Sequence, residues 1–346
     1  EDAIRVAVNG YGAIGKRVVD AVRLQPDMVL AGVADVATDW RPRILEQGGV
    51  PLFGADAAHV SAMEAAGLRV TGTFDELLTR SDVVVDCTPK GRGAENARLY
   101  RDIGVKFVVQ GGEAHEVAGH SFVAEVNFAE AVGRTGTRVV SCNTTSIVRT
   151  LGALAGNGLV ERARGTLMRR ATDPWESHMG GIMNTVVPEA DIPSHQALDA
   201  QTVLPNLDVV TMAVRVPQTL AHVHMWSVDL TRPASLEEVL AAFGDSPRIA
   251  RARMSDGLTA INTVKEVASD MGRPRGDLYE VVLWEEMLTV RGTELFYGYM
   301  VDNLAIVIPE TIDAVRALGG WVTDAGTSIR MTNESLGIRG GVWPPV

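Results

Sequence analysis

A cysteine stands in the stretch VVSCNTTS, residues 139–146, of a chain that contains only two cysteines. The valines before it predict a buried strand, and the apolar spacing of NTTSIVRTLGAL predicts a helix after it. A thiol at a strand end and helix N-terminus lies near free N–H groups, which lower its pKa and favour attack on a carbonyl carbon. Cys142 is therefore a candidate nucleophile, with an unreactive packed cysteine as the alternative. Cys87 ends an apolar run and is interpreted as a small buried hydrophobe.

A second set of residues could hold phosphates. Gly10, Gly12 and Gly15 have the spacing G-x-G-x-x-G, in which glycines let the backbone approach a pyrophosphate at a helix N-terminus. An acid 20 residues after the last glycine could bind the ribose hydroxyls. The residues expected to contact a dinucleotide here are Gly10, Gly12, Ala13, Ile14, Gly15 and Asp35.

The acid also bears on the choice of cofactor. Asp35 would repel a 2′-phosphate, which favours NAD over NADP. Arg41 and Arg43 follow a few residues later and could reverse that preference.

The elements around these glycines have the order of a dinucleotide-binding fold. Residues 4–8 read as a short apolar strand, the residues from Ile14 recur at helical spacing, and residues 28–34 form the next strand. The same order of strand, turn, helix and strand recurs in SDVVVDCTPKGRGAENARLYRDIGVKFVVQGG, with strands at 83–86 and 105–109. Ligands of doubly wound sheets lie over the C-terminal ends of the strands. The crevice that holds the cofactor is therefore expected to include Thr88, Pro89 and Gly112.

Length and composition limit the number of domains and the class of protein. The 346 residues suit two domains, and 46% apolar with 22% charged residues is typical of a soluble globular protein. Two cysteines indicate a reducing, cytoplasmic location without a disulfide framework. The net charge of −11 argues against nucleic-acid binding, and the apolar runs are too short to span a membrane.

Nine colinear segments resemble the archaeal-type (type II) glyceraldehyde-3-phosphate dehydrogenases. They are NGYGAIGKRV, DCTPKGRGAEN, QGGEAHE, VVSCNTT, RRATDP, IPSH, TMAVRVPQTLAHVH, DGLTA and IPETIDAVRAL. The resemblance implies an α/β fold, with a doubly wound (Rossmann) domain for NAD(P) and an α+β catalytic domain with a mainly antiparallel sheet. The expected division is 1–141 with the C-terminal helix region 302–346 for the first domain, and 142–301 for the second. It also implies a glycolytic homotetramer.

The family's chemistry carries over to matching positions. Cys142 resembles the nucleophile that forms a thiohemiacetal with the aldehyde and, after hydride transfer, a thioester that inorganic phosphate cleaves. His222 resembles the base that takes the thiol proton. His224 shares a face with His222, but no third ligand is evident, so no metal is expected and His224 is interpreted as structural.

The remaining site residues follow from the same resemblance. Arg169 and Arg170 match the family's paired arginines and would point in opposite directions from a strand, with a solvated charge pair as the alternative. The expected substrate contacts are Ser141, Asn143, Thr144, Arg169, His195 and Gln196. Two further cofactor contacts are expected at Arg170 and Asn303.

Several positions depart from the family's pattern. A lysine–threonine pair suited to NADP is replaced by Asp35 and Val36, and the glycine after CNTT by Ser146. Gln196 replaces a second histidine, and Asn303 replaces a cofactor-contacting glutamine. Three readings stay open: an authentic glyceraldehyde-3-phosphate dehydrogenase, a relative acting on another aldehyde, and an inactive dinucleotide-sensing protein.

The C-terminal half adds two expectations. Strand-like runs at TMAVRV, AHVHMWSVDL and VVLWEEMLTVRGTELFYGYM form a sheet that either meets another subunit or packs within the chain. The final GGVWPPV, with two prolines, is expected to be a loose tail.

Overall fold

The computed structural model describes residues 3–344 and divides the chain into two units. Unit 1 holds the described residues up to Val140 together with Ile308–Gly337. Unit 2 holds Ser141–Val307 and the described residues from Ile338 onward. The division differs from the expected one, because Ser141, residues 302–307 and residues 338–344 fall in unit 2.

Unit 1 is built on one parallel sheet with the order β4-β3-β2-β1-β5-β6-β8-β7. The chain crosses from one edge to the centre between β4 and β5, so β1 and β5 lie side by side at the topological switch point. The strands are β1 (Ile4–Asn9), β2 (Met28–Asp35), β3 (Leu52–Gly54), β4 (Gly72–Thr73), β5 (Val83–Asp86), β6 (Lys106–Val109), β7 (Ser121–Phe122) and β8 (Gly136–Val139).

Helices connect these strands, as parallel pairing requires. They are α1 (Ala13–Leu24), α2 (Trp40–Gln47), α3 (Ala57–Ala65), α4 (Phe74–Leu78), α5 (Arg92–Ile103), α6 (His115–Ala118) and α7 (Ala124–Ala131), with α13 (Val307–Gly319) and α14 (Ala325–Leu336) near the C-terminal end. The expected Rossmann architecture is confirmed.

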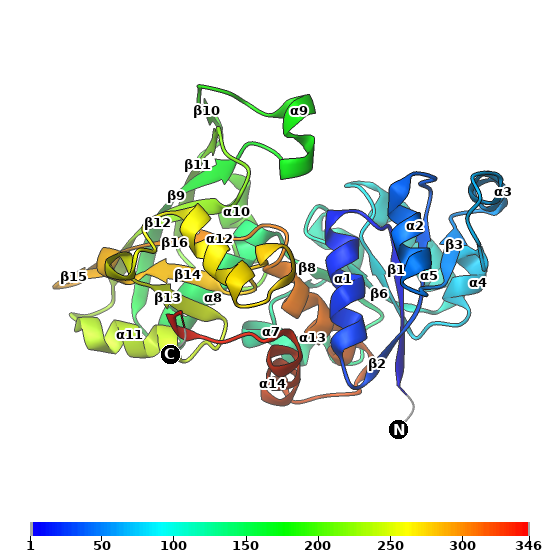
Figure 1. The fold of residues 1–346 in the computed structure, drawn as a ribbon. Helices are drawn as coiled ribbons and strands as arrows, with labels where there is room; N and C mark the ends of the chain where they lie inside the picture. Colours follow the sequence, from blue (N-terminus) through cyan, green and yellow to red (C-terminus); the bar gives the residue numbers. More distant parts are fainter. Residues whose placement is uncertain (1–2, 345–346) are drawn as a thin grey trace. The chain divides into compact units, whose positions relative to one another are not determined.

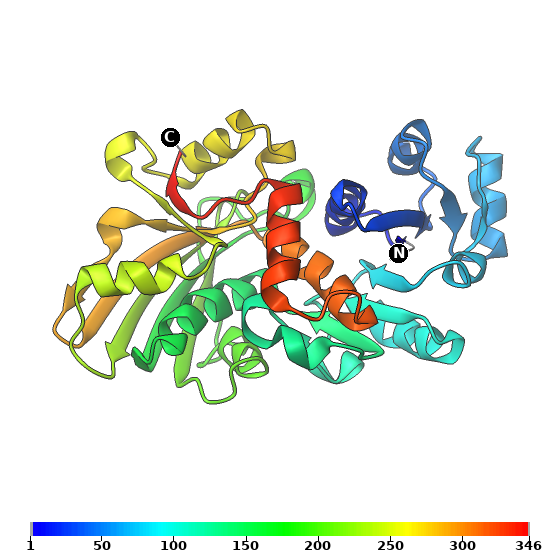
Figure 2. The same ribbon diagram turned by 90° about the horizontal axis from the view of Figure 1, so that it is seen from below.

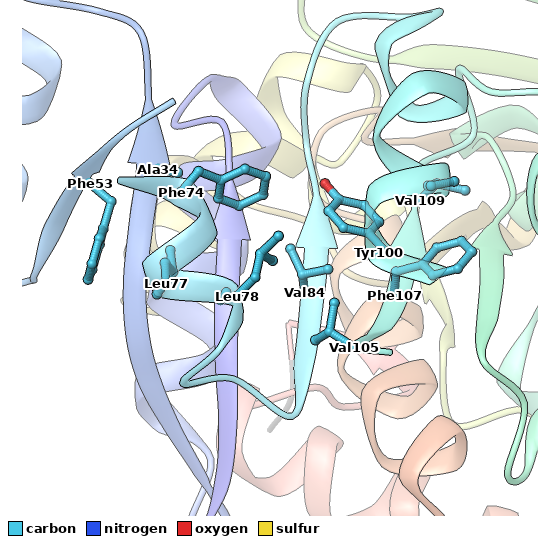
Figure 3. Close-up of a cluster of buried hydrophobic side chains, with 12 residues drawn as sticks. Ala34, Phe53, Phe74, Leu77, Leu78, Val84, Tyr100, Val105, Phe107 and Val109 are labelled. Atoms are coloured by element: carbon cyan, nitrogen blue, oxygen red, sulfur yellow. The ribbon is translucent and has the colours of Figure 1, made fainter. Parts of the chain in front are cut away.

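An apolar cluster on one face of this sheet packs α4 and α5 against the strands. Figure 3 shows the Tyr100 ring between Phe74 and Phe107. The centroid of the Tyr100 ring lies 6.2 Å from that of Phe74 and 5.6 Å from that of Phe107. The Tyr100 hydroxyl donates to Asp86 Oδ2 at 2.7 Å and accepts from Asn9 Nδ2 at 3.0 Å. The core therefore fixes polar groups at the C-terminal ends of β1 and β5.

The returning helices α13 and α14 lie side by side, orange and red in Figures 1 and 2. Arg316 on α13 is fully buried and makes a two-point ion pair with Asp27, in the turn between α1 and β2. The Arg316 guanidinium also donates to Thr332 Oγ1 on α14 at 2.6 Å. A buried charge requires such partners, so these contacts join three segments of unit 1.

Unit 2 contains a mixed sheet with the order β10-β11-β9-β12-β16-β14-β13-β17, and β15 pairs with β16. β12 is antiparallel to both β9 and β16, whereas β11 is parallel to β9. The strands are β9 (Val160–Arg170), β10 (Val187–Pro188), β11 (Val209–Val216), β12 (His222–Leu230), β13 (Ile249–Ala252), β14 (Val281–Trp284), β15 (Thr289–Arg291), β16 (Glu294–Val301) and β17 (Gly341–Trp343).

The helices of unit 2 are α8 (Cys142–Gly156), α9 (Ser177–Gly180), α10 (His195–Gln201), α11 (Leu236–Gly244) and α12 (Ile261–Asp270). α8 packs on α10 and α11. The chain between β9 and α10 makes a long excursion that carries α9 and β10, drawn in green in Figure 1. Met179, Met183 and Ile192 are exposed along this excursion.

The expectation of a loose C-terminal tail is wrong for residues 340–344. β17 pairs in parallel with β13, and the Trp343 side chain is fully buried, with Nε1 donating to the Arg339 carbonyl at 2.9 Å. The partner strand lies about ninety residues earlier, which the local pattern of the tail does not reveal. Residues 345–346 lie outside the described part of the chain.

Candidate active site

Cys142 is the first residue of α8, and Ser141 is its N-cap. The Ser141 hydroxyl oxygen accepts from the Thr144 N–H at 3.3 Å, so one of the free donors of the first turn is satisfied. The Cys142 side chain is partly exposed. The predicted position of this thiol, at a strand-to-helix turn, is therefore confirmed.

His222, the first residue of β12, lies beside the thiol. Its Nε2 is 3.5 Å from Cys142 Sγ. Its Nδ1 accepts a hydrogen bond from the backbone N–H of Arg170 at 3.0 Å. Burial, together with His224 and Arg170, holds the pKa of His222 well below its usual range. The neutral ring therefore carries its proton on Nε2, facing the sulfur.

The charge balance at the thiol differs from the sequence expectation. Burial raises the pKa of Cys142 to about 11, although Arg170, the Asn143 backbone N–H and Arg169 lower it, and Asp302 raises it further. The prediction of a lowered pKa is wrong, because removing the sulfur from water outweighs the nearby positive charges. Attack therefore depends on a small thiolate population.

The paired arginines both lie near this centre, and each is held by an acid. Arg170 Nη2 bonds to the Asp173 carboxylate, and Arg169 Nη1 bonds to the Glu189 carboxylate. Both acids belong to the excursion after β9. The interpretation as a freely solvated charge pair therefore does not hold, since both guanidinium groups are only partly exposed and salt-bridged.

Helix α10 meets the first turn of α8. Thr144 Oγ1 donates to Asp199 Oδ2 at 2.7 Å, and Ser141 Oγ lies 2.9 Å from Thr144 Oγ1. Of the two residues expected here for substrate binding, His195 is exposed at the start of α10. Gln196 is fully buried, and its Oε1 accepts from Ser194 Oγ at 2.6 Å. The two side chains are thus not brought together.

Asn303 follows β16 in unit 2. It is partly exposed and comes directly after Asp302, the acid that raises the pKa of Cys142. Asp302 is buried and accepts from Lys265 Nζ at 2.6 Å and from the Leu278 N–H at 3.2 Å. These contacts fix the loop on which Asn303 stands.

The glycine motif in unit 1 has the geometry of a pyrophosphate cradle. Gly10 has φ +95°, in the left-handed region, and a Cβ at Gly15 would lie 1.9 Å from the Gly10 carbonyl oxygen. Gly12, in contrast, has no heavy atom within 4 Å of where its Cβ would stand. Two glycines are therefore needed for the turn and its packing on α1, and the third leaves open space at the helix N-terminus, which fits a dinucleotide phosphate.

Asp35 lies at the end of β2, next to this loop. Its Oδ2 accepts from the Tyr11 N–H at 2.6 Å, and its Oδ1 accepts from the Val36 and Ala37 N–H groups at 2.7 and 2.8 Å. The carboxylate is held in one orientation by backbone donors. Ala13 and Ile14, in the first turn of α1, are partly exposed beside Gly12.

The loops after β5 and β6 lie at the same sheet edge. Thr88 N–H and Oγ1 both donate to Asp86 Oδ1, at 2.9 and 2.5 Å, and a Cβ at Gly10 would lie 3.0 Å from the Cys87 carbonyl oxygen. Pro89 and Gly112 are exposed. The structure therefore brings the predicted crevice residues of unit 1 to neighbouring loops. Cys87 is partly exposed and not fully buried as expected. Burial of its sulfur, together with the charge of Asp86, raises the pKa of the thiol well above its usual value.

Three acids at these sites were not singled out from the sequence. Glu113 Oε1 accepts from the N–H groups of Gly91 and Gly93 at 2.7 and 3.2 Å, which ties the loop after β6 to the start of α5. Asp199 and Asp302 have the contacts described above. Their roles depend on partners far away in the sequence, and only the QGGEAHE segment gave a signal for any of them, Glu113.

Across residues 3–344, no group of three or more His, Cys, Asp or Glu side chains is placed to hold a metal ion. His222 and His224 share a face, but each ring nitrogen has a contact within the protein. No helix in the same range is long and apolar enough to cross a membrane.

Comparisons with known proteins cover nearly the whole chain. The family model described as glyceraldehyde 3-phosphate dehydrogenase, C-terminal domain, matches residues 141–284. The model described as dihydrodipicolinate reductase, N-terminus, matches residues 4–112. The second match supports a nicotinamide dinucleotide as the cofactor of unit 1.

Curated relatives match this chain over nearly their whole length. A glyceraldehyde-3-phosphate dehydrogenase of Metallosphaera sedula is 44% identical over 98% of this chain and 99% of its own. Those of Hyperthermus butylicus and Pyrobaculum calidifontis are 42% and 45% identical, over 99% and 96% of this chain and 99% and 97% of their own. With the thiol, the imidazole and the glycine cradle in place, the chain belongs to the glyceraldehyde-3-phosphate dehydrogenase family of oxidoreductases.

Proposed function

We propose that this chain oxidises glyceraldehyde 3-phosphate to 1,3-bisphosphoglycerate, with a nicotinamide dinucleotide and inorganic phosphate. The observation that carries the proposal is the 3.5 Å contact between Cys142 Sγ and His222 Nε2 at the start of α8. Both residues lie within 141–284, the segment that matches the C-terminal-domain model of the family. The substrate comes from the names of the relatives.

The reaction starts when the Cys142 thiolate attacks the aldehyde carbon. A C–S bond forms, and the electron pair of the C=O bond moves to oxygen, giving a thiohemiacetal. The nicotinamide supplies a hydride acceptor when it is bound. After hydride loss from carbon, the C=O bond returns as a thioester on Cys142. A phosphate oxygen then attacks the acyl carbon, and the thiolate leaves.

His222 is placed to donate a hydrogen bond from Nε2, first to the thiolate and then to the aldehyde oxygen as it gains charge. The base role expected from the sequence needs a free lone pair on Nε2. The ring would gain that lone pair by moving its proton to Nδ1, where the Arg170 N–H now donates. Donation is therefore the role that the observed hydrogen bond favours.

The other polar groups surround this centre from the first turn of α8 and from β9. Asn143 and Ser141 are proposed to bind the aldehyde oxygen and the substrate hydroxyl. Arg169 is proposed to bind the substrate phosphate, because its charge acts on Cys142. The remaining proposed substrate contacts are Thr144, His195 and Gln196, and the proposed cofactor contacts in unit 2 are Arg170 and Asn303.

The preferred cofactor is proposed to be NAD. The fixed carboxylate of Asp35 would repel a 2′-phosphate at the end of β2. The two arginines that could reverse this preference have other partners. Arg41 pairs with Asp39, and Arg43 Nη2 donates to the Ala66 carbonyl at 2.7 Å.

The test is formation of NADH at 340 nm with glyceraldehyde 3-phosphate and NAD, with and without phosphate or arsenate. Turnover that requires the anion is expected. Turnover without it would mean that water cleaves the thioester. No turnover with this substrate, but turnover with another aldehyde, would support the diverged relative, for which the burial of Gln196 in place of a histidine is the structural argument.

We also propose that the protein works as a cytoplasmic homotetramer. The resemblance supplies this expectation, and the exposed apolar side chains of the excursion after β9 support a subunit contact. The mass in solution by light scattering tests it, and a stable monomer at enzyme concentrations used in assays would contradict it. Folded protein that binds NAD and oxidises no aldehyde would favour the inactive, dinucleotide-sensing alternative.

A further inference from the structure

His224 lies near the Cys142 thiol and has no part in the proposed reaction. It stands on β12 two residues after His222, is fully buried, and lies opposite Tyr299 in the register with β16. Its Nε2 is 2.9 Å from Asn143 Oδ1, and its Nδ1 is 2.9 Å from the Tyr299 hydroxyl. The ring thus bridges the sheet and the first turn of α8.

The direction of these two hydrogen bonds follows from the protonation of the ring. Burial and the charge of Arg169 lower the pKa of His224 to about 3, so the imidazole is neutral at ordinary pH and has one N–H. An amide oxygen can only accept, which places the proton on Nε2. Nδ1 then accepts from the Tyr299 hydroxyl at 2.9 Å, because burial raises the pKa of that phenol and keeps it protonated. The same hydroxyl lies 3.2 Å from Ser146 Oγ, which is the longer and weaker of its two contacts.

The consequence falls on Asn143, the residue after the nucleophile. Its Oδ1 is turned toward His224, and its carbonyl accepts from Ser146 Oγ at 2.8 Å. Among residues 3–344, no group accepts from its Nδ2. A terminal amide otherwise rotates over a broad range. The hydrogen bond from His224 therefore holds the Asn143 amide in one of its two orientations. In this orientation the Nδ2 hydrogens of Asn143 are available to a ligand.

We propose that His224 is a positioning residue, which orients the Asn143 amide so that Nδ2 donates to the aldehyde oxygen while Cys142 adds to the carbonyl carbon. The inference rests on the proposed function, since it requires carbonyl addition at Cys142. Tyr299 supports it by fixing the tautomer of the ring. The device explains why a second histidine stands on the same face as His222 without serving as a ligand or a base.

The first experiment compares His224→Leu with His224→Gln, in which the amide keeps an N–H donor. Loss of one donor to an oxyanion costs roughly 10²–10³ in kcat. Misorientation of Asn143 for part of the time should cost less, about 10–100-fold in His224→Leu with little change in KM. His224→Gln should recover most of that loss. Equal kcat for His224→Leu and wild type would overturn the inference.

A second readout separates positioning from general damage. In the alkylation of Cys142 by iodoacetamide, the thiolate displaces iodide from a saturated carbon and no oxyanion forms. The rate at fixed pH should therefore stay within about twofold of wild type in His224→Leu. A rate that falls in parallel with kcat would show that the variant disturbs the thiol itself. The inference would then be wrong.

A mutant cycle tests whether the effect passes through Asn143. If it does, the double variant Asn143→Ala with His224→Leu should be no slower than Asn143→Ala alone, and additive losses would contradict the inference.

Should His224→Leu not fold, the same cycle is run with Tyr299→Phe, for which roughly a 2–12-fold loss of kcat is expected from the removal of one hydrogen bond. A wild-type protein that oxidises no aldehyde would refute the proposed function instead, before any variant is compared.

Discussion

The ionisation of Cys142 is the property of this site that can be measured most directly. Burial raises the pKa of this thiol to about 11. Only the thiolate reacts with iodoacetamide. At about pH 8, roughly one Cys142 thiol in a thousand is ionised, compared with roughly one in four for a thiol of pKa about 8.5. Alkylation should thus be roughly 200-fold slower than that of an ordinary exposed cysteine.

The sign of the pH dependence follows from the same shift. Because a raised pKa favours the neutral thiol, the rate should rise about tenfold for each pH unit between about pH 7 and pH 10. The assay is the pseudo-first-order loss of dehydrogenase activity, with the label located by mass spectrometry. Cys87→Ser is the matched control, since it removes the other thiol and should leave the rate unchanged.

Two results would refute this reasoning. A rate that is flat between about pH 7 and pH 9 would show that the thiolate is already formed, and that Arg170 and Arg169 outweigh burial. Label at Cys87 with full loss of activity would show that the wrong cysteine has been assigned as the nucleophile.

Three further predictions concern His222, Asp35 and Trp343. His222→Ala should lower kcat by roughly 10²–10³, the cost of losing one donor to a developing negative charge, whereas His222→Gln, which keeps an N–H donor, should lose clearly less; equal losses in the two variants would favour the base role. Asp35→Ser should raise kcat/KM for NADP relative to NAD, and an unchanged ratio would remove Asp35 from cofactor selection. Trp343→Ala should lower the free energy of unfolding by about 3–5 kcal/mol, because it empties a fully buried site; urea unfolding measures this, and a loss below about 1 kcal/mol would restore the interpretation of a loose tail.

Much of unit 1 could be predicted from its sequence. The apolar runs at Ile4–Asn9 and Val83–Asp86 end in glycine or proline turns, so their boundaries are local features. Parallel strands then bring their C-terminal ends to one edge, which places the glycine loop beside Thr88 without further information.

The unpredicted parts depend on contacts between distant segments. The raised pKa of Cys142 comes from burial, which the helix N-terminus does not reveal. The N–H that fixes the His222 ring belongs to Arg170, 52 positions away. β17 depends on β13, and the tail's prolines gave the opposite signal. Pairing of this kind becomes visible only when the sheet is assembled.

The division of unit 1 between the two ends of the chain has a consequence for its synthesis. A ribosome completes all eight strands of the sheet well before it makes α13 and α14. During that interval Asp27 lacks the guanidinium of Arg316, and the surface that α13 and α14 cover in the finished unit is open to water. Unit 1 therefore stays incomplete for as long as the residues of unit 2 between Ser141 and Val307 are being translated.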